Sequence, residues 1–278
     1  MKFDRVFIER ELIDSSRVST ILEKLSYRDA YQVDSYEEVF QARKKPYLDK
    51  RESLNLFLAK KKGALVKEAP DAYGVEGDPH YYFFHTLNCI YECQYCYLQG
   101  YFDSPDIVVF LNFEEIAKEI DQIAQREISN GKTPWFHAGE FGDSLALSNF
   151  IGEWPYYIDL FRKLPQARLE LRTKSANVRP LLEIEAPSNV VVSFSMSDPR
   201  SIKEFDFKTP SFDARFSAIK RLVERGYQIG IHLDPMIMSS NLSENYSPLL
   251  ECLRKTVPQS MLSYICLLYT SPSPRDSC

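Results

Sequence analysis

The chain has 278 residues, of which 44% are hydrophobic, and a formal net charge of -5 at pH 7. This composition is that of an ordinary globular protein and excludes an intrinsically disordered chain. The negative charge also disfavours an extended basic surface for nucleic acid, although lysine-rich stretches occur within the first 67 residues. We expect those stretches to form a solvated face.

The N-terminal stretch MKFDRVFIERELIDSSR has neither the basic start nor the apolar core of a secretory signal. No stretch approaches the roughly 20 apolar residues that a membrane-spanning helix needs. The six cysteines are clustered in one place and scattered elsewhere, which suits reduced thiols better than a disulfide framework. We therefore expect a cytoplasmic protein with no membrane partner.

Residues 1–78 are predicted to form a small N-terminal α+β subdomain. They contain the strand-like RVFIER and the helical SSRVSTILEKL, but they do not follow the regular alternation that begins later. The stretch EAPDAYGVEGDPH, with its Pro, Asp and Gly residues, is typical of a connection between two such parts.

In residues 79–265, strand-like runs alternate with helical patterns, one of which begins at the capping residue Ser211 and ends at Gly226. The strand-like runs are YYFFH, PWFHAGE, RLELRTK, VVVSFSMS, YQIGIHLDP and SMLSYI. Such alternation predicts parallel βαβ units. Six repeats in roughly 185 residues fit an α/β fold with a partial (βα)6 TIM-type barrel better than a closed eight-stranded barrel, which needs about 250. Functional groups are then expected at the carboxyl ends of the strands.

Residues 266–278, CLLYTSPSPRDSC, change character, because Ser-Pro-Ser-Pro ends any periodic pattern. This segment resembles the translated read-through of a sequencing-library adapter. We predict a non-native tail in which Cys266 and Cys278 have no function, and we expect the native barrel to continue beyond the point where this sequence leaves it.

Three cysteines, Cys89, Cys93 and Cys96, lie within eight residues. Iron–sulfur clusters are usually held by four cysteine thiolates, so three local thiolates on a [4Fe-4S] cube leave one iron open to a chelating small molecule. Zinc is the alternative, with His85 or a distant residue as the fourth ligand. Zinc sites usually bring their ligands as two separated pairs, and this segment has one C-x-x-C unit, so we favour the cluster. Three buried core cysteines fit poorly in a segment rich in Tyr, Asn, Glu and Gln.

The C-x3-C-x2-C motif, with the aromatic Tyr95 before its last cysteine and its position after the first of six strands, resembles the radical S-adenosylmethionine superfamily. In that superfamily S-adenosylmethionine chelates the open iron and is reductively cleaved to a 5'-deoxyadenosyl radical. The resemblance implies two cofactors, the [4Fe-4S] cluster and S-adenosylmethionine. It also implies an external electron donor such as a flavodoxin or a ferredoxin.

More narrowly, the order of CIYECQYCYLQGYF, NFEEIAKEIDQIA, LRTKSANV, VVSFSMS and RLVERGYQIGIHLDPMI resembles the spore photoproduct lyase family over most of residues 5–265. The resemblance implies that Tyr97 is catalytic and relays a hydrogen atom. A Thr-Lys pair matches Thr173 and Lys174, a Phe-Ser pair matches Phe194 and Ser195, and the resemblance implies that Lys174 and Ser195 contact the cofactor. Each of these residues also has a plain structural interpretation. Lys174 could be a lysine that extends to solvent, Ser195 an ordinary strand hydroxyl, and Tyr97 a tyrosine that only packs against its neighbours.

The segment after the second strand departs from the family, which carries a hydrogen-donating cysteine where this chain has Glu140. A glutamate cannot deliver a hydrogen atom as a thiol does. The Ala138-Gly139-Glu140 stretch instead resembles the superfamily's Gly-Gly-Glu motif, which implies that Gly139 and Glu140 bind the cofactor's amino group by charge-assisted hydrogen bonds. The alternative is a solvated glutamate. Asp143 is expected to orient either Lys174 or the ribose.

The family resemblance implies repair of a thymine dimer in DNA, which requires a flipped-out lesion and a phosphate-binding groove. Two features disfavour this reaction. The hydrogen-donating cysteine of the family is missing, and the part of the family's sequence that faces DNA follows the sixth strand, where this sequence leaves the family pattern. Two alternatives therefore stay open. One is a family member that acts on a substrate other than DNA, and the other is a zinc-stabilised scaffold that only binds a partner.

Overall fold

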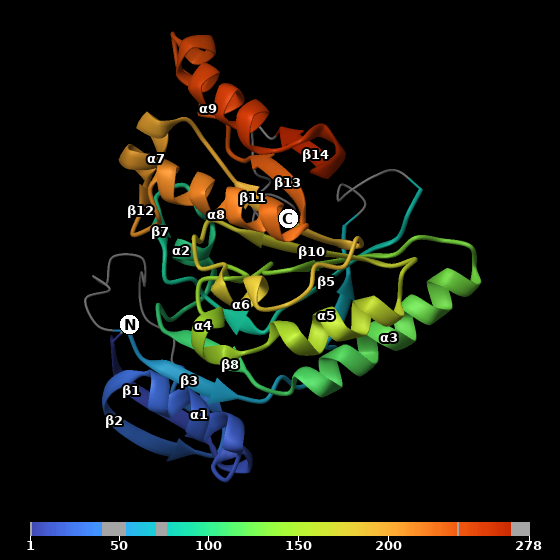
Figure 1. Ribbon diagram of the computed structural model, residues 1–278. Coiled ribbons are helices and arrows are strands. Elements are labelled where there is room, and N and C mark those ends of the chain that lie inside the picture. Colours follow the sequence, from blue (N-terminus) through green and yellow to red (C-terminus); the bar gives the residue numbers. More distant parts are fainter. Residues whose placement is uncertain (1, 41–53, 71–76, 238, 268–278) are drawn as a thin grey trace.

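The structure is a computed structural model that describes residues 2–40, 54–70, 77–237 and 239–267 (Figure 1). Its larger sheet has seven strands in the order β14-β13-β11-β10-β9-β5-β4. These strands are β4 (Val66–Glu68), β5 (His80–Phe83), β9 (Trp135–Ala138), β10 (Arg168–Thr173), β11 (Val190–Ser195), β13 (Gln228–Leu233) and β14 (Leu262–Leu267).

All neighbouring pairs from β5 to β14 are parallel, and only the edge strand β4 runs antiparallel to β5. The six predicted strands are therefore confirmed, and they lie side by side in chain order. The described strands do not close into a barrel, because β4 and β14 are the two edges of this sheet. The fold is thus mixed α/β with an open, mainly parallel sheet.

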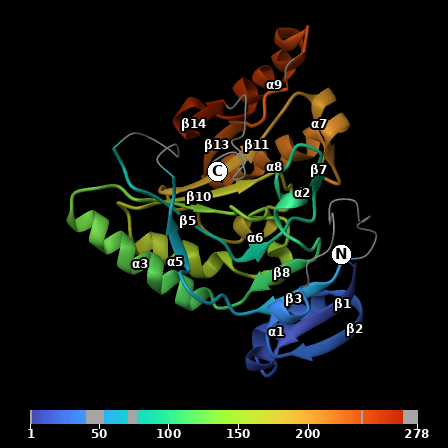
Figure 2. The same ribbon diagram turned by 180° about the vertical axis from the view of Figure 1, so that it is seen from behind.

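Helices follow the parallel strands and pack against one face of the sheet (Figures 1 and 2). They are α3 (Phe113–Ser129), α4 (Ser148–Ile151), α5 (Trp154–Lys163), α6 (Arg179–Leu182), α7 (Pro199–Phe205), α8 (Phe212–Arg225) and α9 (Leu242–Thr256). Helix α8 has the predicted ends: the Ser211 hydroxyl accepts from the Ala214 amide at 3.3 Å, and Gly226 takes a left-handed φ of 98°. None of the described helices combines the length and the apolar character that crossing a membrane would require.

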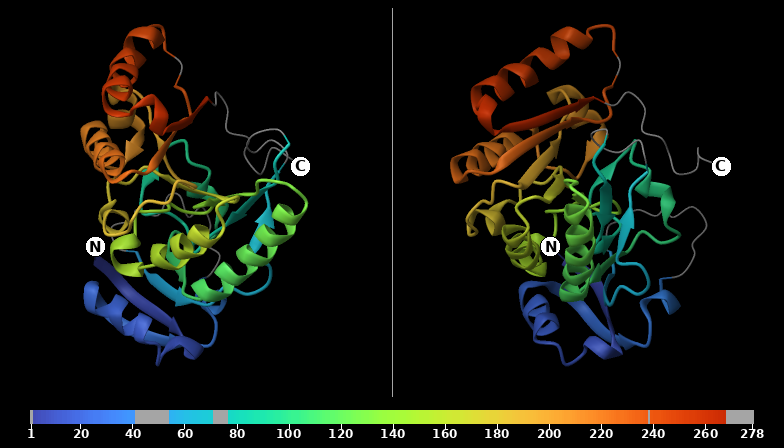
Figure 3. Two further views of the ribbon diagram at one scale, coloured as in Figure 1. Left: turned by 45° about the vertical axis from the view of Figure 1, so that its right-hand side comes forward. Right: turned by 90° about the vertical axis from the view of Figure 1, so that its right-hand side faces the viewer.

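A second sheet of five strands forms the end of the molecule that carries the N-terminal strands (Figure 3). Its strands, in order, are β2 (Ser26–Val33), β1 (Lys2–Glu9), β3 (Leu56–Ala59), β8 (Ile107–Phe110) and β6 (Thr86–Leu87), with α1 (Ser16–Lys24) beside them. Short 3-10 helices are η1 (Arg10–Leu12), η2 (Tyr36–Glu38) and η4 (Gln259–Met261). Strands β6 and β8 belong to the segment that surrounds the cysteines, so this sheet crosses residue 78, and the predicted subdomain boundary stays a prediction.

Strand β14 continues two residues into the predicted tail, where Cys266 pairs with His232 and Leu267 with Leu233. The remainder of that tail, 268–278, lies outside the described residues. So do the whole of the first lysine-rich stretch, residues 42–51, and residues 71–76 of the predicted connection.

Successive side chains along the parallel strands point alternately to the two faces of the sheet, and the two faces have different environments. In β10 and β13, Leu169, Leu171, Ile229 and Ile231 are fully buried against the helices. The residues between them point to the opposite side of the sheet, which we call the inner face. Many residues on this face are polar, so the sheet has an apolar layer under its helices and a polar inner face.

Candidate active site

The three cysteines lie in a loop that begins after β6, and we call residues 88–106 the cysteine loop. Cys93 is in the short strand β7 (Glu92–Cys93), and Cys96 precedes α2 (Leu98–Tyr101). Asn88 closes the loop, because its side-chain amide donates to the carbonyls of Ser104 and Asp106, each at 2.7 Å. Figure 2 shows β7 and α2 beside α8, near the end of β11.

None of these three cysteines forms a disulfide within the described residues. Burial raises the pKa of Cys89 well above its usual value, and burial raises the pKa of Cys93 to about 12. The charge of Cys96 adds to both shifts, whereas that of Lys174 opposes the shift at Cys93. The three sulfurs are therefore close enough to repel one another as thiolates, and a positively charged metal group would relieve that repulsion.

The donor set fits an iron–sulfur cluster. Three thiols from one loop could each bind a different iron of a cube, so the sulfurs need not converge on one ion. Within the described ranges, no group of three or more His, Cys, Asp or Glu side chains is arranged around the position of a single metal ion.

Glu140 follows β9 in a tight turn that requires glycine at position 139. Gly139 has a φ of +92°, and a Cβ there would lie 2.4 Å from the Ser144 hydroxyl oxygen. The Tyr97 hydroxyl donates to the Glu140 carbonyl oxygen at 2.7 Å. Burial, together with the charge of Glu140, raises the pKa of Tyr82 on β5, so the Glu140 carboxylate lies near that ring.

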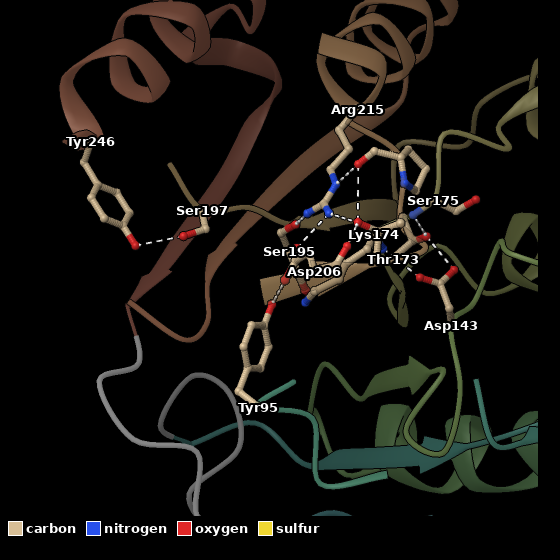
Figure 4. Close-up of polar contacts among 12 residues, drawn as sticks. Tyr95, Asp143, Thr173, Lys174, Ser175, Ser195, Ser197, Asp206, Arg215 and Tyr246 are labelled. Carbon is tan, nitrogen blue, oxygen red and sulfur yellow. Dashed lines mark hydrogen bonds and ion pairs between the residues drawn. The ribbon is translucent and has the colours of Figure 1, made fainter. Parts of the chain in front are cut away.

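Asp143 holds the end of β10. Its carboxylate accepts from the Thr173 hydroxyl and from the Lys174 amide, both at 2.7 Å. Burial raises the pKa of Asp143, although these donors oppose the shift. Asp143 therefore holds the backbone of Lys174, and its expected role toward Lys174 or the ribose stays a prediction. The Lys174 ammonium in turn lies 5.5 Å from the centre of the Tyr95 ring (Figure 4).

Ser195 is the last residue of β11 and is buried. Its carbonyl oxygen accepts from Arg215 Nη1 at 3.0 Å, and Arg215 Nη2 binds Asp206 Oδ2 at 2.7 Å. Asp206 also accepts from the Tyr95 hydroxyl (Figure 4). These contacts bring the cysteine loop and the end of β11 together.

The sequence analysis gave no role to Asp206 or Arg215. A signal existed for Arg215, because it occupies the same stripe of α8 as the buried Ala218, Ile219 and Leu222. An arginine on a buried stripe is unusual and calls for a buried partner. Asp206 lies in the two-residue strand β12 (Asp206–Phe207), which no periodic pattern marks.

The polar residues of the inner face form a second group that the sequence analysis missed, and we call it the inner-face cluster. It consists of His80, His137, Glu170, Arg172, Ser193, His232 and Tyr264, which come from all six parallel strands. Glu170 is its centre: it accepts from His232 Nε2 at 2.8 Å, and it also binds Ser193, His137 and Tyr264. Burial would raise the pKa of Glu170, but Arg172 and His137 hold it well below its usual value.

A family model called spore photoproduct lyase matches residues 78–269. The chain belongs to this family. Curated spore photoproduct lyases from Clostridium acetobutylicum and Bacillus subtilis are 23% and 26% identical to it over 164 and 177 residues. These matches cover 59% and 63% of the chain but 48% and 51% of the relatives, so the chain spans about half the length of the curated relatives it matches.

Solved structures of spore photoproduct lyase share the fold. One mutant superposes with a TM-score of 0.80 at 20% identity, covering 99% of this chain and 81% of that one. A second mutant, solved with bound AdoMet and dinucleoside spore photoproduct, gives the same TM-score, identity and coverage. The sequence resemblance is thus confirmed at the level of family and fold. The roles of the site residues stay predictions.

Proposed function

We propose that this chain is the radical S-adenosylmethionine core of a lyase-type enzyme. In this proposal the six parallel strands are a partial barrel, residues 79–265 are its unit, and residues 1–78 are an N-terminal subdomain. Cys89, Cys93 and Cys96 would hold a [4Fe-4S] cluster. One observation carries the proposal: the cysteine loop lies beside the carboxyl ends of the neighbouring parallel strands β10 and β11. The charge of Lys174, which follows β10, acts on Cys93, and Asp206, the strand partner of Cys93, is joined through Arg215 to the Ser195 carbonyl.

The cofactor-binding groups would act by charge and by position. The Lys174 ammonium suits a carboxylate, and Asp143 holds its backbone in place. Glu140 suits an amino group, and the turn at Gly139 brings the backbone close to it. When bound, the cluster and S-adenosylmethionine would supply the reductive cleavage that yields a 5'-deoxyadenosyl radical. The chain's own residues orient the molecule and keep water away from it.

Tyr97 would be the hydrogen-atom relay. Its hydroxyl donates to the Glu140 carbonyl, so its ring has a fixed direction close to the turn where the family has its cysteine. The carboxyl group of Glu140 cannot take over the cysteine's role. A return of hydrogen to the substrate would therefore depend on Tyr97 or on another donor.

The substrate would be a DNA lesion of the thymine-dimer type, with electrons from a flavodoxin or a ferredoxin. This is supported by family membership and by the solved relative that holds dinucleoside spore photoproduct. The glutamate at position 140 favours a second candidate, a family enzyme acting on a substrate other than DNA. Dinucleoside spore photoproduct, offered with S-adenosylmethionine to the reduced, cluster-loaded protein, separates the two candidates by whether thymine bases are restored.

Anaerobic reconstitution with iron and sulfide tests the cofactor. We expect about four irons per chain, a broad visible absorbance that dithionite bleaches, and 5'-deoxyadenosine from added S-adenosylmethionine. Replacing Cys89, Cys93 and Cys96 together by alanine should abolish all three. Cys252→Ala, in helix α9, is the matched control and should retain them.

A zinc scaffold would give the opposite result. Bound zinc with no iron uptake, and no cleavage of S-adenosylmethionine under reducing conditions, would overturn the proposed function.

A further inference from the structure

A continuous chain of polar contacts leads from the cysteine loop to the end of β11 (Figure 4). The Tyr95 hydroxyl donates to one oxygen of Asp206, and Arg215 Nη2 donates to the other at 2.7 Å. Arg215 Nη1 then donates to the Ser195 carbonyl at 3.0 Å. Tyr95 lies between two of the predicted cluster ligands, and Ser195 is a predicted cofactor contact.

Arg215 is the fixed point of this chain of contacts. It is fully buried, and its Nε donates to the Pro210 carbonyl at 3.1 Å while Nη2 also reaches the Thr209 hydroxyl at 2.6 Å. A planar guanidinium bound to several acceptors has little freedom to tilt or slide. Asp206 is therefore held in one orientation by Arg215 and offers its remaining oxygen to the cysteine loop.

The backbone supports the same connection. Asp206 pairs with Cys93 in the small antiparallel sheet of β12 and β7, and the Gln94 amide donates to the Phe205 carbonyl at 2.9 Å. On the other side, the Tyr95 ring lies beneath the ammonium of Lys174. One tyrosine thus touches the groups that fix β11 and the lysine that follows β10.

We propose that Tyr95, Asp206 and Arg215 are positioning residues that set the cysteine loop relative to Lys174 and Ser195. This inference rests on the proposed function. One small molecule can touch the cluster and both strand ends only if the loop and the strands keep a fixed separation, because small displacements cost affinity and rate steeply. Buried ion pairs add little net stability, so the contribution of this pair is geometry.

Tyr95→Phe is the decisive variant, because it keeps the ring beneath Lys174 and the Asp206–Arg215 pair and removes only the hydroxyl. We expect the iron content per chain to equal that of the wild type. The dissociation constant for S-adenosylmethionine, measured by equilibrium dialysis, should rise about tenfold, the equivalent of one modest hydrogen bond. The change that S-adenosylmethionine causes in the electron paramagnetic resonance spectrum of the reduced cluster should become smaller.

Tyr31→Phe, an exposed tyrosine on β2, is the matched control and should change none of these readouts. Arg215→Lys keeps the charge but loses the planar fork. If the residues act as one unit, the double variant Tyr95→Phe with Arg215→Lys should weaken binding no more than the stronger single variant. Additive losses would overturn the inference, as would a Tyr95→Phe protein with unchanged affinity and spectrum. If the wild type takes up no cluster, the proposed function fails instead.

Discussion

Two buried carboxylates in this protein bind basic groups in different surroundings. Asp206 joins segments from separate parts of the chain: the cysteine loop, helix α8 and, through Arg215, the end of β11. Glu170 instead joins strands of one sheet, because it binds groups from β9, β11, β13 and β14. The first arrangement fixes a loop against a strand end, and the second fixes strands against one another. We therefore expect changes at Asp206 to be felt in ligand binding as well as in stability, and changes at Glu170 in stability alone.

The largest effect is expected for Glu170→Ala. This change leaves Arg172, His137 and His232 without their shared acceptor, and breaking a buried ion pair on one side costs about 3–5 kcal/mol of unfolding free energy. Urea unfolding measures the loss. Glu183→Ala is the control, because its contact with Arg179 is an exposed surface pair worth about 0.5 kcal/mol. If Glu170→Ala were as stable as Glu183→Ala, Glu170 would not fix the strands against one another, and the proposed difference between the two buried carboxylates would be wrong.

A smaller loss is expected for Gly230→Ala. A Cβ at this position of β13 would lie 2.7 Å from the Tyr264 ring and 2.9 Å from the Ser193 Cβ, so Tyr264 could no longer reach across to Glu170. Such overpacking costs about 1–3 kcal/mol. The double variant with Tyr264→Ala removes the main clash, and thermal unfolding should show a loss smaller than the sum of the two single losses. If the stability loss of the double variant equalled the sum of the two single losses, Gly230 would not be needed to make room for Tyr264 in the inner-face cluster.

The smallest effect is a pH dependence caused by His232. Burial lowers the pKa of His232 below its usual 6.5, so the folded protein keeps this side chain neutral while the unfolded chain takes up a proton. Its contribution is present above pH 6.5 and is lost as the pH falls below that value. Unfolding free energies should therefore decline more steeply from pH 7 to about pH 5 in the wild type than in His232→Gln, whose amide can still donate to Glu170. If the unfolding free energies of the wild type and of His232→Gln declined equally with falling pH, this prediction would be wrong.

Much of the fold could be predicted from the chain alone. The six strands were visible as short apolar or β-branched runs, and the caps of α8 were visible as Ser211 and Gly226, because period, capping and turn chemistry are local properties. The five-stranded sheet was not predicted. Its members β6 and β8 are four residues or fewer in length. Strand β8 pairs with β3, from the first 60 residues, and β6 pairs with β8, and such non-local pairing leaves no periodic signal.

The candidate site, like the fold, could be predicted only in part from the sequence. The cysteine spacing could be interpreted directly, whereas the roles of Glu140, Lys174 and Ser195 were implied only by the resemblance to the family. Asp206 and Arg215 could not be paired, because nothing in a single sequence shows that they share a buried contact. Glu170 and His232 stood at alternate positions of their strands, but only the sheet order shows that these positions converge.

By itself, the sequence determined which chemical groups are present, since the three clustered thiols, Lys174 and Ser195 are set by residue identity and local pattern. The tertiary structure decided how these groups are held. Buried charges are tolerated only where opposite charges and donors meet them, and that meeting depends on packing between segments far apart in the chain. The Tyr95 contact to Asp206 and the convergence of strands on Glu170 are therefore properties of the folded molecule, not of any stretch of its sequence.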